Sequence, residues 1–343
     1  MIHKLAISNY KSVKELTITP KRVNIFIGEH NTGKSNILEA LTWFSANALQ
    51  QTTFHELFRF KNVSNFFFDS NGNNSIEINT DEISCRIRYA RNNNGALLNF
   101  FEGVIYPTGL FNNNVDELFH SRNNQEVCTF QLSFKENTIE NVKMTPPTNF
   151  RTYQFKRLER FENGYLPFLS PPFGENIPIL LQSNSIWKQM VSEFIRSKGF
   201  RLVIKPTENE IEIAKDVNEE LYSFPYQTIS ETMQRYIFLL LAVETNENSI
   251  MVLDEPEANM FPFFVKEFAE RIELNQSNQY FISTHNPYLL GSLLEKTKKE
   301  DIAVFVTKMN DFKTTAKPCN EEQIQELISS EGGAFFSLNN IMD

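Results

Sequence analysis

The sequence predicts an α/β fold with a mainly parallel core sheet, an antiparallel β subdomain and an inserted mixed or helical subdomain. Both ends of the chain alternate short apolar strands with amphipathic helices, which is typical of a parallel sheet covered on both faces. From about 66 to 134, apolar and polar residues alternate with period two, which favours half-buried antiparallel strands. Together with the mixed middle, these patterns predict a first lobe over 1–135, an inserted subdomain over 136–215 and a second lobe over 216–343.

The composition is that of a globular protein. Of the 343 residues, 41% are hydrophobic and 22% are charged. No run approaches the roughly 20 apolar residues of a membrane-spanning helix, and the N-terminus has no signal-peptide pattern, so we expect a cytoplasmic protein. Cys85, Cys128 and Cys319 are too far apart for a C-x-x-C metal or redox motif. The net charge of −9 means that nucleic-acid binding would need a local basic patch.

The first lobe begins with a strand and a helix. The apolar run over 23–27 ends at a glycine turn and predicts a buried strand. Apolar residues then recur at helical spacing at Ile37, Leu41, Phe44 and Ala48, which predicts a helix over 34–48. The strands with period two are expected around Ile76 and Ile78, Ile83 to Ile87, and Phe130 to Phe134.

The later part of the chain returns to alternating strands and helices. Helices are expected over 185–197 and 230–244, from Pro262 onward, and after Asn320; strands are expected over 249–253, 280–283 and 302–306. Pro262 suits the first turn of a helix because its missing N–H has no partner there in any case. Asn320 and Gln323 have the spacing of an N-terminal capping pair.

A phosphate-binding loop is the most specific motif. Residues 28–35, Gly-Glu-His-Asn-Thr-Gly-Lys-Ser, fit G-x-x-x-x-G-K-[ST] between the predicted strand and helix. Glycines let successive backbone N–H groups point at phosphate oxygens. Lys34 is expected to reach the β- and γ-phosphates of ATP, and the Ser35 hydroxyl to bind Mg²⁺. The nucleotide-binding residues predicted from this loop are Gly28, Asn31, Thr32, Gly33, Lys34 and Ser35.

Two further strands end in residues that suit ATP hydrolysis. Asp254 and Glu255 follow the apolar strand over 249–253. Because ligands bind at the carboxyl ends of parallel strands, we expect Asp254 to face Mg²⁺ and Glu255 to orient and deprotonate the attacking water. A solvated acidic turn is the alternative, and the phosphate loop favours the functional interpretation. His285 follows the strand over 280–283 and could donate a hydrogen bond to the γ-phosphate, although single histidines are more often structural.

In this order, the three segments resemble the Walker A motif, Walker B motif and switch histidine of ABC ATPases. The opening Asn9-Tyr10-Lys11-Ser12, Asn36 directly after the phosphate loop, and Asp254-Glu255-Pro256-Glu257-Ala258 resemble the heads of SMC, RecF and OLD-like proteins. The resemblance implies an ABC-type ATPase head, with Asn36 among the nucleotide-binding residues. It also implies a head-to-tail dimer in which each ATP lies between one subunit's Walker A motif and the other's signature motif.

The signature candidate departs from the transporter form, L-S-G-G-Q. Residues 228–235 read Thr-Ile-Ser-Glu-Thr-Met-Gln-Arg and lack both glycines. Ser230 is a good N-cap, and Glu231 suits the positive end of a helix, but a carboxylate there would repel a nearby phosphate. Ser230, Gln234 and Arg235 are the expected contacts to the partner's nucleotide; an ordinary helix start is the alternative. Gln50 and Gln51 are the candidates for the glutamine of the loop that links ATP to the inserted subdomain.

The sequence indicates less about the biological process that ATP hydrolysis would drive. Relatives of this shape often serve DNA repair or anti-phage defence, and many OLD-like proteins carry a Toprim nuclease. Too few residues follow His285 for such a domain, and no D-x-D occurs. The first hypothesis is therefore the ATPase component of a two-component defence system with a separate effector, such as a nuclease.

A DNA-repair or chromosome-associated ATPase that binds nucleic acid directly is the second hypothesis. Its support is a basic stretch over 151–160, in which Lys156 and Arg157 lie beside Tyr153 and Phe155. Cations and aromatic rings can hold single strands, although a solvated charged face is the simpler alternative. A transporter motor, the third class, would require membrane association.

Overall fold

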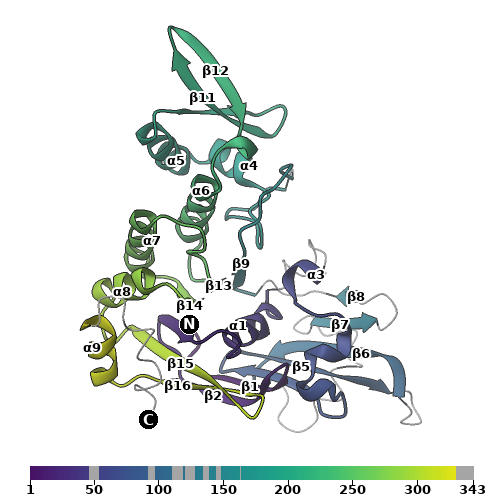
Figure 1. The fold of residues 1–343 in the computed structure, drawn as a ribbon. Coiled ribbons are helices and arrows are strands. Elements are labelled where there is room, and N and C mark those ends of the chain that lie inside the picture. Colours follow the sequence, from purple (N-terminus) through teal and green to yellow (C-terminus); the bar gives the residue numbers. More distant parts are fainter. Residues whose placement is uncertain are drawn as a thin grey trace.

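A computed structural model of the chain describes residues 1–45, 54–91, 97–109, 119, 128–133, 139–143, 148–162 and 164–329. The described residues form two large sheets in the lower part of the view and an arm that rises from them (Figure 1). Within the described residues, no helix combines the length and the apolar character needed to cross a bilayer.

The core sheet has six strands in the order β16-β15-β3-β14-β13-β9. Their bounds are Phe150–Tyr153 for β9, Ile250–Asp254 for β13, Gln279–Ser283 for β14, Val23–Gly28 for β3, Ile302–Asn310 for β15 and Lys313–Pro318 for β16. Every neighbouring pair is parallel except the β15–β16 hairpin. This arrangement confirms the predicted mainly parallel core sheet.

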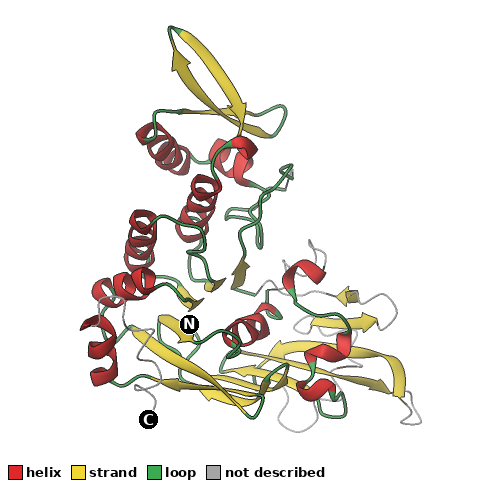
Figure 2. Cartoon of the chain, in the orientation of Figure 1, coloured by secondary structure: helices red, strands yellow, loops and turns green. Residues whose placement is uncertain are grey.

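Both faces of the core sheet are covered. On β3 all six residues are buried, as expected for a central strand of a parallel sheet. One face packs with α6 (Glu231–Glu244), α7 (Pro262–Leu274) and α8 (Pro287–Lys296), and Leu327 of α9 (Glu321–Ser329) joins the same core. The other face packs on α1 (Lys34–Thr42), which lies between the two large sheets. Figure 2, in the orientation of Figure 1, shows α7 and α6 extending toward the arm, whereas α1, α8 and α9 lie beside the sheets.

The second large sheet is the predicted antiparallel subdomain. It has seven strands in the order β2-β1-β4-β5-β6-β7-β8, and all its pairs are antiparallel. The strands are β1 (Leu5–Tyr10), β2 (Val13–Ile18), β4 (Ile76–Thr80), β5 (Ile83–Arg91), β6 (Leu97–Pro107), β7 (Cys128–Ser133) and β8 (Ile139–Lys143). Short helices α3 (Phe54–Leu57), η1 (Val63–Phe66) and η2 (Phe68–Ser70) lie beside it.

The arm has the mixed character predicted for an inserted subdomain. The predicted bounds, 136–215, differ from it, because they include β8 and β9 of the two large sheets and leave out β12. It holds α4 (Ile177–Ser183), α5 (Ser185–Ser197), η4 (Tyr226–Thr228) and a three-stranded antiparallel sheet of β10 (Arg201–Lys205), β11 (Glu210–Val217) and β12 (Glu220–Pro225). The predicted helix over 185–197 is confirmed, and the Asn184 side chain caps it. This small sheet was not predicted from the sequence. All six residues of β12 are exposed, but Leu202 and Ile204 of β10 pair with Ile213 and Ile211 of β11 and form an apolar face on the core.

The predicted helix over 34–48 is wrong at its end, because α1 stops at Thr42. The next three N–H groups, of Trp43, Phe44 and Ser45, bond to carbonyls three residues back, so the chain tightens into a turn. The turn brings Ser45 Oγ to 2.8 Å from Thr152 Oγ1 of β9. Helical spacing of apolar residues continued past this point, but tertiary contacts ended the helix. The predicted helix starts at Pro262 and after Asn320 are confirmed.

Trp43 anchors the core between α1 and the antiparallel sheet. Its ring is fully buried, 4.5 Å from the ring centroid of Phe58 and 5.3 Å from that of Phe130. The substitution Trp43→Ala should lower the free energy of unfolding by about 3–5 kcal/mol, since it leaves a large cavity. Urea unfolding measures the change.

The matched control is Ile186→Ala, because Ile186 on α5 is 72% exposed. Its effect should stay within about 0.5 kcal/mol. A loss at Trp43 no larger than the loss at Ile186 would contradict this description of the core.

Candidate functional site

The carboxyl ends of four core strands meet at one edge of the sheet. Asp254 of β13 pairs in register with Ser283 of β14, and Ser283 pairs with Phe26 of β3. On the other side of β13, Leu253 pairs with Tyr153 of β9. Residues that directly follow these positions therefore lie beside one another, although the sequence separates them widely.

The phosphate loop joins β3 to α1 at this edge. Asn31 and Gly33 have positive φ angles of 62° and 92°, and Gly28 has a φ of 152°. A Cβ on Gly33 would lie 1.9 Å from Thr314 Oγ1, so only glycine fits there. The Lys34 ammonium donates to the carbonyl oxygens of Gly28 at 3.0 Å and Glu29 at 2.8 Å, which holds it against the loop. The loop has the left-handed turns that the motif requires.

Hydroxyl groups fasten the loop to the β15–β16 hairpin. Thr32 Oγ1 donates to the Glu29 carbonyl at 2.9 Å and lies 2.7 Å from Thr307 Oγ1. Thr307 Oγ1 in turn donates to the Ile27 carbonyl at 3.0 Å. Thr32 is thus a brace inside the loop as well as a predicted nucleotide contact. Thr307 belongs to this brace but not to the predicted site.

The opening Asn-Tyr-Lys-Ser motif fastens the first turns of α1. The Asn36 amide donates to Ser12 Oγ at 2.7 Å. The Tyr10 hydroxyl donates to Glu39 Oε1 at 2.8 Å, and the Lys11 ammonium forms an ion pair with the same carboxylate. Burial lowers the pKa of Lys11, while Glu39 opposes that shift. These contacts give the motif a structural role, and they direct the Asn36 amide toward Ser12.

Ser35 and Asp254, the two predicted magnesium ligands, are brought together. Ser35 Oγ donates to Asp254 Oδ1 at 3.1 Å, and Ser283 Oγ donates to the same oxygen. In the described part of the chain, no group of three or more His, Cys, Asp or Glu side chains could hold a metal ion alone. A cation here would therefore share one hydroxyl and one carboxylate with phosphate oxygens, which suits the coordination habits of Mg²⁺.

Glu255 and His285 face each other beside that pair. His285 Nε2 lies 3.5 Å from Glu255 Oε1. The His285 ring stacks on His30 of the phosphate loop with 4.4 Å between centroids. Burial lowers the pKa of His285 to about 4, and the positive charges of Lys34 and His30 add to the shift. The imidazole is therefore neutral near pH 7, so one ring nitrogen can donate while the other accepts.

The charged groups of this site also act on Lys34. Burial lowers its pKa to about 8, and the carboxylates of Glu255 and Asp254 oppose that shift. Its ammonium stays largely charged at neutral pH, close to two carboxylates. The site therefore combines a cation, two carboxylates and a neutral imidazole at one sheet edge.

A cavity of about 300 Å³ opens beside these residues and brings in two that the sequence analysis missed. Arg59 and Gln154 line it together with Ser35, Asp254 and Glu255. Gln154 directly follows β9, and Tyr153 of β9 pairs with Leu253 of β13, so the position of Gln154 matches that of Asp254 across the sheet. This strand end was only weakly indicated by the sequence, because β9 has only four residues. Gln50 and Gln51 lie outside the described residues.

The signature candidate starts α6 as predicted. Ser230 Oγ accepts from the Met233 N–H at 3.3 Å, and Ser230 is exposed. Glu231 Oε1 accepts from Arg235 at 3.0 Å and from Asn259 at 3.2 Å; its bond to Arg235 lowers its pKa. Arg235 therefore neutralises the carboxylate that replaces the first glycine of the transporter form.

Gln234 and Arg235 have environments that the sequence did not predict. Gln234 is 2% exposed, and its amide donates to the carbonyl oxygens of Gln227 and Ile229. We assign it to holding the preceding loop, which corrects its prediction as a nucleotide contact. Arg235 lies over the Phe155 ring and lines its own subunit's cavity beside Glu255.

The basic stretch over 151–160 does not form a continuous surface for nucleic acid. Tyr153 is buried and donates to the Leu169 carbonyl at 2.7 Å. Arg151 is buried over the Phe168 ring. Lys156 bonds to Glu56 at 2.8 Å, and Arg157 donates to a backbone carbonyl. The structure thus offers little support for single-strand binding by this segment.

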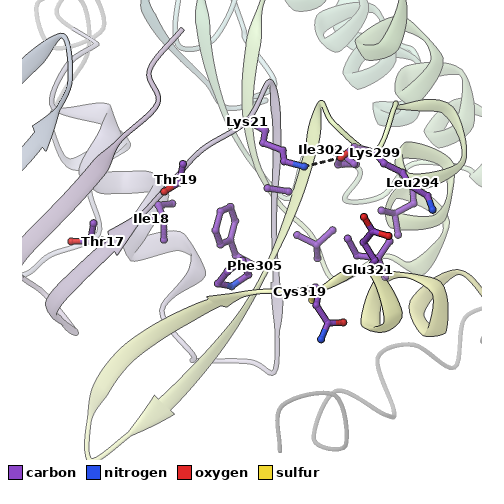
Figure 3. A pocket seen from close by; sticks show the side chains of 15 residues that line it. Thr17, Ile18, Thr19, Lys21, Leu294, Lys299, Ile302, Phe305, Cys319 and Glu321 are labelled. Atoms are coloured by element: carbon purple, nitrogen blue, oxygen red, sulfur yellow. Dashed lines mark hydrogen bonds between the residues drawn. The ribbon is translucent and has the colours of Figure 1, made fainter.

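A larger cavity of about 630 Å³ lies elsewhere, between β2, β15 and α9. Figure 3 shows its largely apolar lining, with Ile18, Phe305 and Cys319 around the space and Lys21 bonded to the Lys299 carbonyl at its edge. Burial raises the pKa of Cys319 to about 11. None of the residues predicted for nucleotide chemistry lines this cavity.

Comparison with known protein families identifies the family of this chain. Residues 23–291, most of the chain, match the family described as "AAA domain, putative AbiEii toxin, Type IV TA system". The chain belongs to this AAA-domain family. The matched range begins with β3 and ends in α8, so it includes the phosphate loop and the ends of β13 and β14.

Two individual proteins resemble this AAA-domain chain over nearly its whole length. An "ATP/GTP phosphatase" of Helicobacter pylori (strain ATCC 700392 / 26695) is 21% identical over 380 residues, covering 98% of this chain and 100% of the relative. A solved structure described as "Crystal structure of the SmcHead bound to the C-winged helix domain of ScpA" aligns with a TM-score of 0.50 and 16% identity, covering 95% of this chain and 99% of that one. The fold is thus the SMC-head-like α/β fold of an ABC-type ATPase head.

The left-handed turn at Gly33 can be tested through stability. Gly33→Ala should lower the free energy of unfolding by about 1–3 kcal/mol, because a Cβ would strain the backbone and collide with Thr314. Thermal or urea unfolding measures this loss.

Gly291→Ala in α8 is the control, because no atom lies within 4 Å of its added Cβ. This change should raise stability by about 0.5–1 kcal/mol, as expected for glycine replaced by alanine within a helix. Equal stability of the two variants would show that the loop tolerates a side chain at position 33.

Proposed function

We propose that the chain binds ATP with Mg²⁺ and hydrolyses the γ-phosphate, as an ATP-gated dimer. The observation that carries the proposal is the hydrogen bond from Ser35 to Asp254 at 3.1 Å, with Glu255 and His285 directly beside it. The pair joins the phosphate loop to the end of β13. Membership of the AAA-domain family and the likeness to an ATP/GTP phosphatase support nucleotide hydrolysis.

The phosphate groups would lie over the loop of residues 28–35. Backbone N–H groups at the start of α1 and the Lys34 ammonium provide positive charge for the β- and γ-phosphates. Ser35 and Asp254 would hold Mg²⁺, which when bound neutralises charge on phosphate oxygens. Gln154 and Arg59 line the adjoining cavity, so they are placed to contact the water or the γ-phosphate.

Glu255 is the proposed general base. Its side chain is 47% exposed, so it stays accessible to water, while its backbone is fixed by N–H bonds to the Ser283 carbonyl at 3.2 Å and Ser283 Oγ at 3.1 Å. The neutral His285 would donate a hydrogen bond to the γ-phosphate oxygen. Its distance of 3.5 Å from Glu255 allows both groups to act on one reacting centre.

A second copy would complete the site. Ser230 is exposed, and the first three residues of α6 are half-buried. Large aromatic side chains near the helix starts that follow β13 and β14 are also exposed: Phe261, Phe263 and Tyr288 are 66%, 61% and 62% exposed. Exposed aromatic groups near a catalytic edge are typical of a surface that a partner covers. This supports the head-to-tail dimer in which Ser230 faces the partner's nucleotide.

The proposed biological role is the ATPase component of a two-component anti-phage defence system in the cytoplasm, with a separate effector such as a nuclease. The family description names a toxin of a toxin–antitoxin system, which supports work beside a second protein. Intrinsic nuclease activity in the pure protein would contradict a separate effector. Salt-dependent DNA binding that is lost on changing Lys156 and Arg157 would instead favour the repair or chromosome role.

Glu255→Gln tests the chemistry. The rate of phosphate release should fall at least about 100-fold, because the amide cannot accept a proton from water, while ATP affinity stays within about threefold. Glu247→Gln changes an exposed glutamate before β13 and should leave the rate unchanged. If the Glu255 variant hydrolyses ATP at the normal rate, another group is the base.

ATP-gated association is tested with the same hydrolysis-deficient protein. With ATP and Mg²⁺, Glu255→Gln should shift from monomer to dimer mass in light scattering, and adding Ser230→Arg should prevent the shift by blocking the interface. Ser197→Arg on the exposed end of α5 is the matched control and should still dimerise. A dimer that forms equally well with Ser230→Arg would place the interface elsewhere.

A further inference from the structure

The loop after β13 carries a second glutamate whose environment is opposite to that of Glu255. Glu257 is 5% exposed, whereas the Glu255 side chain is 47% exposed. Glu255 has a positive φ of 46°, so the backbone turns sharply between the two residues. The turn directs one carboxylate to the reacting edge and the other into the protein.

Glu257 reaches the end of the neighbouring strand β14. The Thr284 hydroxyl donates to Glu257 Oε1 at 2.5 Å, and Thr284 is fully buried. The Asn286 N–H donates to Thr284 Oγ1 at 2.9 Å. Thr284 and Asn286 flank His285, which carries the imidazole. Glu257 therefore orients the hydroxyl that holds the chain on both sides of His285.

A carboxylate at this buried position lowers the stability of the fold. Its second oxygen, Oε2, has no hydrogen-bond partner among the described residues. Burial raises the pKa of Glu257 to about 7, and the bond from Thr284 opposes that shift. Burying such a group without a counter-ion opposes folding. A buried group that opposes folding at the edge of a reacting site is more readily explained by function than by stability.

The imidazole that this segment carries has little else to hold it. Its described contacts are the stacked His30 ring of the phosphate loop and Glu255, which is 3.5 Å away and half exposed. By contrast, the Thr284 N–H bonds to the Phe26 carbonyl at 3.1 Å, so the backbone is fixed up to Thr284. The direction of the chain at His285 then depends on the Thr284 hydroxyl, which bonds to Asn286 N–H beyond the imidazole and is oriented by the carboxylate of Glu257.

We propose that Glu257 is a positioning residue, whose buried carboxylate fixes the Thr284–His285 peptide and thereby holds the His285 imidazole beside Glu255 and the γ-phosphate. The inference rests on the proposed ATP hydrolysis. Glu257 itself touches no reacting atom. The Glu-Pro-Glu sequence thus supplies both the base and the support for its neighbouring imidazole, one carboxylate on each side of the turn.

The kinetic test compares variants that remove the hydrogen bond between Thr284 and Glu257 with variants that keep it. Glu257→Ala and Thr284→Val should each lower kcat by about 10- to 100-fold, with the KM for ATP within about twofold, because a displaced imidazole affects the transition state more than binding. Glu257→Gln keeps an acceptor oxygen for the Thr284 hydroxyl and should restore kcat to within about threefold of the normal value. Thr284→Ser should likewise retain activity.

A double-mutant cycle shows whether the effect passes through His285. In a His285→Ala background, Glu257→Ala should lower kcat by less than about threefold more, because the imidazole it positions is gone. Fully multiplicative losses would overturn the proposal. So would a Glu257→Ala protein with normal kcat, or a Glu257→Gln protein as impaired as Glu257→Ala at equal thermal stability.

A readout without hydrolysis separates this inference from the proposed function. The chain has only five histidines, so the His285 ring resonance in ¹³C-histidine NMR can be assigned by its loss in His285→Ala. Glu257→Ala should shift or broaden that resonance, and Glu257→Gln should not. If the normal protein releases no phosphate, the proposed function fails, while an unmoved His285 resonance in Glu257→Ala overturns the positioning role alone.

Discussion

The parallel pairing of β3, β14 and β13 is the constraint on which the rest of the site depends. In-register pairing aligns the end of the phosphate-loop strand with Ser283 and Asp254. Because parallel strands all run in one direction, the residues after their carboxyl ends collect at one edge. The Ser35–Asp254 bond exists only because this pairing brings two segments together that lie more than 200 positions apart. A slip of one residue would turn every side chain to the opposite face.

The phosphate loop is held from outside by hydroxyl groups. Thr307 and Thr314 of the β15–β16 hairpin pack against Gly28 and Gly33, so close that a methyl group would collide with either. Ser12 links Thr314 to Asn36 through bonds of 2.6 Å and 2.7 Å. The antiparallel sheet, the hairpin and α1 therefore fix the loop jointly. Such bracing keeps the backbone N–H groups oriented before any phosphate arrives, which reduces the reorganisation that binding requires.

Burial decides what each acidic group in this region can do. Asp254 is bonded by two hydroxyl groups, which suits a cation ligand. Glu255 is half exposed and open to water, and Glu257 is buried with a pKa raised to about 7. Glu231 is neutralised by Arg235, so the missing signature glycine does not leave an unpaired charge at the start of α6. Four carboxylates of the same chemistry thus have four different environments.

Local sequence patterns were enough to predict the mainly parallel core sheet, the antiparallel subdomain, the phosphate loop and the candidate residues at the ends of β13 and β14. Those features follow from local patterns of apolar residues, glycines and carboxylates. Contacts between distant segments are needed to explain why α1 stops at Thr42, why Gln234 is buried, and why Gln154 and Arg59 line the cavity. These depend on strand pairing and on side chains distant in sequence, since no local pattern records which surfaces will meet.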